Sequence, residues 1–116
     1  MENITSDKLF NLYKSTIASC GTYILSSSEN VVAYNIFEEL DIGAVSFLHQ
    51  NSLIKLLGKG YISEELYKKS TELSDMIKLL KETEWNISKI KTSSNWLKAF
   101  ILADDINIIL ASYNTV

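Results

Sequence analysis

The chain has 116 residues, which is the size of one domain with one hydrophobic core. Hydrophobic residues make up 47% and charged residues 22%, values typical of a folded globular domain and not of a disordered tail. All 11 basic residues are lysines and the net charge is -3, which argues against a general nucleic-acid binder. Without arginine the chain also lacks bidentate phosphate clamps and arginine fingers.

The cysteine and histidine content excludes several other classes. A single cysteine, Cys20, cannot form an intramolecular disulfide, and one cysteine with one histidine falls short of the four ligands of a zinc site. The segment Met1–Ile4 does not resemble a signal peptide, and no uncharged stretch provides the roughly 20 apolar residues of a membrane span. We therefore expect a cytoplasmic protein with a single helical domain, residues 1–116, and no membrane segment.

Two helix starts are predicted in the first part of the chain. Apolar residues recur at helical spacing from Ser6 to Leu25, and either Thr5 or Ser6 can cap this helix. The three serines at 26–28 indicate a break, after which Ser28 can cap a second helix.

Residues 29–58 allow more than one interpretation. They fit one helix or two helices, while 31–34 could also form a short strand by propensity; we favour helix, since no partner strand is evident. Breaks are expected at 41–43 or at 49–51, and Gly58 or Gly60 can end the last helix of this segment.

The helix from Ser63 to Glu82 has the clearest pattern, with a serine cap followed by two glutamates. Its inward stripe is predicted to be Leu66, Ser70, Leu73, Ile77 and Leu80. A connector over 83–92 can hold one or two helical turns capped by Asn86 or Ser88.

The last predicted helix, 94–112, is apolar over most of its circumference and should therefore lie at the centre of the fold. Its narrow polar stripe is Lys98, Asp105 and Ser112. The opposite, inward side is predicted to hold Trp96, Leu97, Phe100, Ala103 and Ile108. The fold class is thus all-α, a compact bundle of about five helices around a buried C-terminal helix.

No set of residues predicts catalysis. Asp104 and Asn107 fall near the apolar side of the last helix, and we interpret them as buried structural polar groups, because an isolated acid lacks catalytic partners. Cys20 lies among apolar residues and His49 at a helix end, where packing and capping are commoner than chemistry. We expect no enzyme activity, cofactor or metal ion.

The charges are unevenly distributed along the chain. Between Lys14 and Lys55 there is no basic residue, whereas four acids give this interval a local charge of -4. These acids are Glu29, Glu38, Glu39 and Asp41. The interval can be an acidic edge that steers a basic partner, or merely a solvated face, and the sequence favours neither.

Several strings along residues 34–110 carry a resemblance to a known group of proteins. They are 37–41 (FEELD), 46–49 (SFLH), 52–57 (SLIKLL), 60–65 (GYISEE) and 96–106. In the spacing of their hydrophobic residues and in the positions of helix ends, they resemble the small all-helical immunity proteins encoded beside bacterial polymorphic toxins, including contact-dependent growth inhibition systems.

The resemblance implies a protein without catalytic activity that binds one cognate toxin in the cytosol and blocks its active or substrate-binding surface. Many such toxins are nucleases with basic faces, so the acids of the lysine-free interval are the candidate partner-binding residues. The expected partner is a basic toxin, with no direct contact to nucleic acid or membrane, and a monomer is favoured. A helical adaptor or regulatory module that can form homodimers is the alternative.

Overall fold

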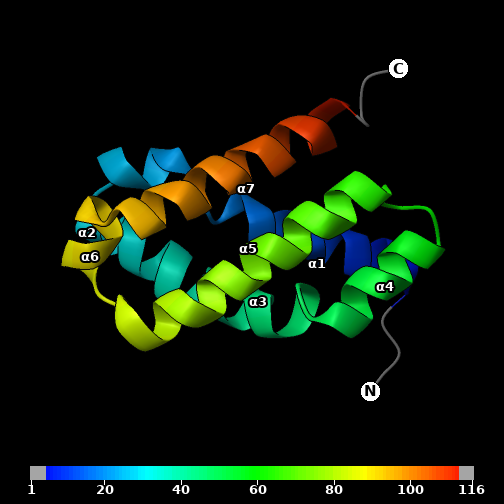
Figure 1. The fold of residues 1–116 in the computed structure, drawn as a ribbon, viewed down its shortest axis with the longest axis horizontal. Helices are drawn as coiled ribbons and strands as arrows, with labels where there is room; N and C mark the ends of the chain where they lie inside the picture. The colour runs from blue at the N-terminus through cyan, green and yellow to red at the C-terminus, as the bar shows by residue number, and fades with distance from the viewer. Residues whose placement is uncertain (1–4, 113–116) are drawn as a thin grey trace.

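The computed structural model describes residues 5–112, which form an all-α bundle without a β-strand in that range (Figure 1). In chain order its elements are α1 (Ser6–Ala18), the 3-10 helix η1 (Thr22–Ser26), α2 (Glu29–Val32), the π-helix η2 (Ala33–Leu40), α3 (Asp41–Phe47), α4 (Gln50–Gly58), α5 (Glu64–Thr83), α6 (Ile87–Thr92) and α7 (Ser94–Ser112). The longer helical runs are α1, the continuous run α2–η2–α3, α4, α5 and α7. The predicted all-α fold is therefore confirmed.

Side-chain caps begin most of these helices where the sequence predicts them. Ser28, Ser63 and Asn86 each accept a hydrogen bond from the backbone N–H three residues later, as expected of N-cap residues. Of the two candidates for the first helix, Thr5 is the cap, because its Oγ1 accepts from the N–H of Lys8. His49 caps α4 by accepting from the N–H of Asn51, so the only histidine has the capping role expected of it.

Residues 29–47 form one uninterrupted helical run, as the favoured helical interpretation predicts, and the strand alternative for 31–34 does not occur. Of the two alternative breaks, the one at 41–43 is absent. The chain passes from α2 through η2 into α3 without leaving helical dihedral angles. Gly43 lies inside this run, where it is buried against Thr16 of α1 and allows the two helices to approach closely. The second predicted break is confirmed, because α3 ends at Phe47 and α4 starts at Gln50.

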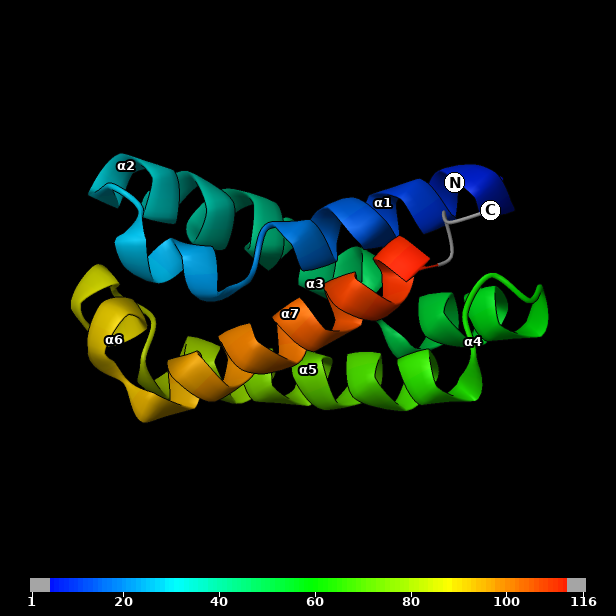
Figure 2. The same cartoon turned by 90° about the horizontal axis from the view of Figure 1, so that it is seen from above.

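The core receives side chains from every helix of the described residues, and α7 packs against both α1 and α5. Seen from above, α7 runs diagonally across the molecule, with α1 on one side and α5 on the other (Figure 2). The stripe predicted for α5 is buried as expected, and Ser70 within it hydrogen-bonds the hydroxyl of Tyr13 at 2.7 Å. The largest completely buried side chains are Tyr13, Ile17, Ile24, Ile36, Leu40, Leu48, Leu53, Leu56, Leu66, Leu73, Trp96 and Phe100.

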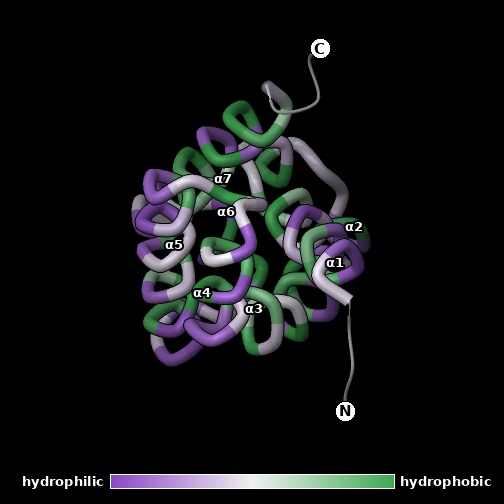
Figure 3. The backbone as a smooth tube through the Cα atoms, turned by 90° about the vertical axis from the view of Figure 1, so that its right-hand side faces the viewer, coloured by the Kyte–Doolittle hydropathy of each residue, from purple (hydrophilic) through white to green (hydrophobic). Residues whose placement is uncertain are grey.

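The C-terminal helix is central but is not buried all round. Hydrophilic residues recur along α5 in Figure 3, whereas hydrophobic residues reach almost to the end of α7. Trp96, Phe100 and Ala103 are buried, as predicted. Leu97 and Ile108 were also predicted to be buried but are exposed. Ile106 and Leu110 are buried although they were not predicted to be. The predicted centre of the buried sector of α7 is therefore wrong.

Candidate protein-interaction surfaces

The acidic interval predicted from the sequence lies on the run α2–η2–α3. Glu29, Glu38 and Glu39 are exposed, while Asp41 is half-buried. Glu29 lies in the first turn of α2, where its carboxylate faces the positive end of the helix dipole. Glu38 and Glu39 lie about two turns further along the run. The structure therefore brings Glu38 and Glu39 together but does not bring Glu29 to them.

Asp41 differs from the other acids because it has a basic partner. The Nζ of Lys81, on α5, forms an ion pair with Oδ1 of Asp41 and also lies 5.8 Å from the ring centre of Trp85. The sequence interval is free of lysine, but in space this lysine neutralises one of its four acids. Asp41 is thus part of the contact between α3 and α5. Of the three acids left without a lysine partner, Glu38 and Glu39 are adjacent and Glu29 lies apart.

Exposed apolar side chains flank these two glutamates on the same helical run. Tyr34, Ile42 and Val45 are 53%, 65% and 63% exposed, and Val31 is also exposed. Ile42 lines the same small cavity as Glu38 and Glu39, and the hydroxyl of Tyr34 interacts with Glu39, while Val31 and Val45 extend this exposed surface along the run. We call this surface the acidic–apolar face and define it as Val31, Tyr34, Glu38, Glu39, Ile42 and Val45.

The π-helical geometry of η2 organises this face. Because a π-helix is closed by hydrogen bonds between residues five apart, side chains at that spacing lie one turn from each other. Tyr34 and Glu39 have this spacing, and a hydrogen bond to the Glu39 carboxylate, reinforced by the charges of Glu39 and Glu38, raises the pKa of Tyr34 above its usual value. The tyrosine hydroxyl therefore lies near the Glu39 carboxylate.

A small cavity of about 100 Å³ opens beside the two glutamates, between α1 and the run η2–α3. Its other lining residues are Leu12, Ser15, Thr16, Ile42, Gly43 and Phe47. The acidic–apolar face is therefore bordered by a shallow depression with both apolar walls and hydroxyl groups.

Asp104 joins α7 to the start of η1 through hydrogen bonds. Its Oδ2 accepts a hydrogen bond of 2.6 Å from Thr22 Oγ1, and its Oδ1 accepts one of 3.2 Å from the backbone N–H of Thr22. Thr22 is the first residue of η1, so this carboxylate from α7 caps η1. Asn107 Nδ2 similarly donates to the carbonyl of Ile17 near the end of α1, at 3.5 Å. Both side chains are half-buried rather than buried as predicted.

Replacing Asp104 with alanine should lower the free energy of unfolding by about 1–2 kcal/mol, because Thr22 loses both of its acceptors. Asp105→Ala is the matched control: its partner is Lys69 in an exposed ion pair, whose loss costs at most about 1 kcal/mol. Urea denaturation followed by circular dichroism measures both. Equal effects of the two substitutions would show that the cap does not stabilise the corner between α1 and η1.

The remaining chemically active side chain, Cys20, is completely buried, as its apolar neighbours in the sequence predicted. Burial, with a smaller contribution from the charge of Asp104, raises the pKa of its thiol far above the usual value. The described residues contain no group of three or more His, Cys, Asp or Glu side chains placed to hold a metal ion. Within residues 5–112, no helix is both long and apolar enough to cross a membrane.

Comparison with models of protein families, with curated proteins and with solved structures finds no match to this chain. The charge pattern of the sequence predicts the glutamates of the acidic–apolar face but not Tyr34, Ile42 and Val45. These apolar residues are close to the glutamates only because 29–47 is one continuous helical run.

Proposed function

We propose that this chain is an immunity protein that binds a cognate bacterial toxin through the acidic–apolar face and occludes the toxin's active or substrate-binding surface. The observation that carries the proposal is the exposure of Glu38 and Glu39 between Tyr34, Ile42 and Val45. Apolar and aromatic anchors beside charged groups are the usual composition of a specific protein interface. The resemblance to immunity proteins supplies the class of partner.

The charges suit a toxin with a basic surface, such as a nuclease. Glu38 and Glu39 are adjacent acids on a run that contains no lysine, so they can attract the groups that would otherwise bind substrate phosphates. Electrostatic attraction of this kind mainly accelerates association, while apolar contacts slow dissociation. We accordingly assign steering to the two glutamates and retention to Tyr34 and Ile42, in the cytoplasm of the producing cell.

The first experiment measures association with the toxin domain encoded beside this chain, by stopped flow at several salt concentrations. The double substitution Glu38→Lys and Glu39→Lys should slow association about ten-fold or more at low salt and flatten its salt dependence. The matched control is Glu72→Lys with Asp75→Lys, which makes the same charge change at two exposed acids of α5. If both double variants slow association equally, or neither does, steering by the acidic–apolar face is wrong.

The apolar part of the face is tested separately by Tyr34→Ala and Ile42→Ala. Each should accelerate dissociation of the complex about ten-fold or more and weaken protection of cells that express the toxin. A normal circular dichroism spectrum and melting temperature show that the variant is folded. Binding of a non-toxin partner through the same face would identify the chain as a helical adaptor, the alternative stated above.

A further inference from the structure

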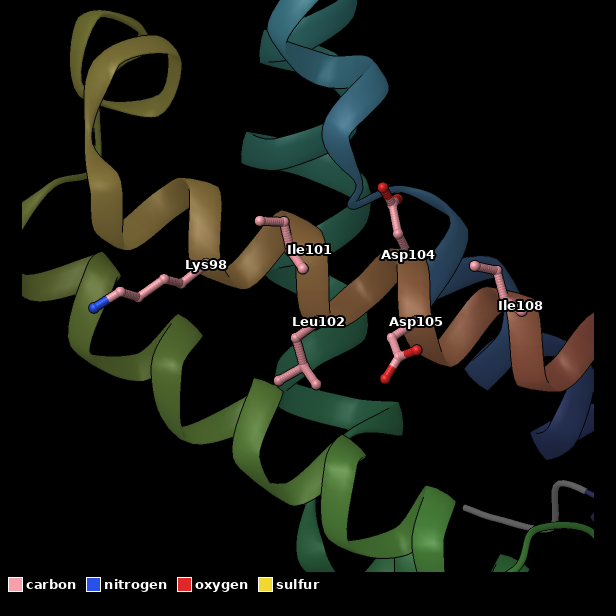
Figure 4. Close-up of a pocket in the computed structure, with 6 residues that line it drawn as sticks. All are labelled: Lys98, Ile101, Leu102, Asp104, Asp105 and Ile108. Carbon is pink, nitrogen blue, oxygen red and sulfur yellow. The ribbon is translucent and has the colours of Figure 1, made fainter.

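A second exposed apolar surface lies on the outer side of α7, away from the acidic–apolar face. Ile108, Ile101 and Leu97 are 69%, 54% and 40% exposed, and they form one row because they follow each other at steps of four and seven. A shallow hollow of about 440 Å³ runs along this side of α7 (Figure 4). Three isoleucine or leucine side chains in one row on a surface helix indicate a contact site.

Three charged side chains line this hollow. Lys98 and Asp105 lie near its two ends, while Asp104 lies between Ile101 and Ile108 and has its carboxylate hydrogen-bonded to Thr22. Lys98 and Asp105 are seven residues, or about two turns, apart and line the same hollow as Ile101 and Ile108. Within residues 5–112 Lys98 forms no ion pair. Asp105 accepts a hydrogen bond from Lys69 on α5, but its side chain remains 50% exposed and one of its carboxylate oxygens is not used by that bond. Both charges can therefore reach a partner that lies on α7.

We propose that a second copy of this chain docks on this face, with the two α7 helices antiparallel across a two-fold axis. In that arrangement Lys98 meets the partner subunit's Asp105, and Leu97 meets the partner subunit's Ile108. The first pair is centred between Ile101 and Leu102 and the second between Leu102 and Ala103, so an axis at Leu102 lies within one residue of both centres. A helix with a positive and a negative group at opposite ends of one face is complementary to itself only in this antiparallel orientation.

The contact is small. One helix face is smaller than the roughly 800 Å² that each partner contributes to a stable interface, so the dimer should be weak and should form only as the protein concentration rises. The residues involved belong to α7 and not to α2–η2–α3. A dimer would therefore leave the acidic–apolar face of each copy accessible to a toxin, and the two proposals can fail independently.

The test exploits the two charges. Lys98→Glu leaves only acids at positions 98 and 105 and Asp105→Lys leaves only lysines there, so each variant alone should remain monomeric. An equal mixture should dimerise at least as well as the unchanged protein, because each of the two pairs between positions 98 and 105 across the axis then joins an acid to a lysine. Sedimentation equilibrium over a wide concentration range measures the association constants, with Lys69→Ala as the control for the loss of the ion pair between Lys69 and Asp105.

Ile101→Asp disrupts the apolar part of the proposed dimer contact and leaves Lys98 and Asp105 unchanged. It should abolish association while preserving the circular dichroism spectrum and toxin binding, since Ile101 is exposed and distant in sequence from the acidic–apolar face. A monomer at all concentrations, a dimer insensitive to Ile101→Asp, or a charge-variant mixture that stays monomeric would each overturn the proposal. Loss of toxin binding in the Ile101→Asp variant would instead assign the face to the toxin and would equally overturn it.

Discussion

Replacing Trp96 with alanine is expected to lower the free energy of unfolding by about 3–5 kcal/mol, the range found when a large buried aromatic side chain is removed. Trp96 is completely buried, and its ring centre lies 5.7 Å from that of Trp85 and 5.4 Å from that of Phe100. Its indole Nε1 also donates a hydrogen bond of 2.7 Å to the carbonyl of Glu84. The substitution therefore removes packing and leaves a carbonyl without its donor.

Trp96→Phe separates these two contributions. It keeps an aromatic ring in the cluster but removes the indole N–H. It should therefore lower the free energy of unfolding clearly less than the alanine substitution does. Chemical denaturation followed by circular dichroism measures both variants, and the phenylalanine variant remains measurable if the alanine variant does not fold. A cost below about 1 kcal/mol for Trp96→Ala would contradict the central position that the structure gives this side chain.

The second large effect is expected from Gly43→Ala. A Cβ atom at this position would lie 2.2 Å from Oγ1 and 2.6 Å from Cγ2 of Thr16, a side chain that is itself buried. Thr16 also donates a hydrogen bond to the carbonyl of Leu12, so it cannot turn away without losing that bond. Overpacking of this kind costs about 1–3 kcal/mol, which outweighs the better helix propensity of alanine.

Gly58→Ala is the matched control, because it makes the same change at the end of α4 where no atom lies within 4 Å of the added Cβ. Because alanine lowers the conformational entropy of the unfolded chain and meets no steric clash here, this substitution should raise the free energy of unfolding by up to about 1 kcal/mol. The expected result is thus a loss of stability at one glycine and no loss at the other, measured in the same denaturation experiment. Stabilisation by Gly43→Ala would mean that α1 and α3 are not in close contact.

The parts of the fold that were predictable are those determined by neighbouring residues. Ser63 with its following glutamates begins α5, and Asn86 begins α6, because a cap requires only a side-chain oxygen and an N–H three residues away. The inward stripe of α5 was also correct, since polar residues on its other side leave one orientation available. Local chemistry therefore defined most helix boundaries and one of the core surfaces.

The incorrect predictions involve contacts between segments distant in the sequence. Gly43 suggested a break, but its small size is needed for contact with Thr16, which only the packed structure reveals. On α7 an apolar circumference does not indicate which sector faces inward, so Leu97 was predicted as buried although it is exposed. In the acidic interval, the ion pair of Asp41 joins residues 40 positions apart, which a count of charges along the chain cannot detect.

The contact between Asp104 and Thr22 has a consequence for how the protein is made. These residues are 82 positions apart, and the contact of Asn107 with Ile17 spans 90 positions. Synthesis proceeds from the N-terminus, so the corner between α1 and η1 lacks these partners until α7 has been produced. Contacts over such separations also close long loops and slow folding. The corner between α1 and η1 therefore leaves the ribosome well before α7 but is among the last parts of the fold to acquire its final structure.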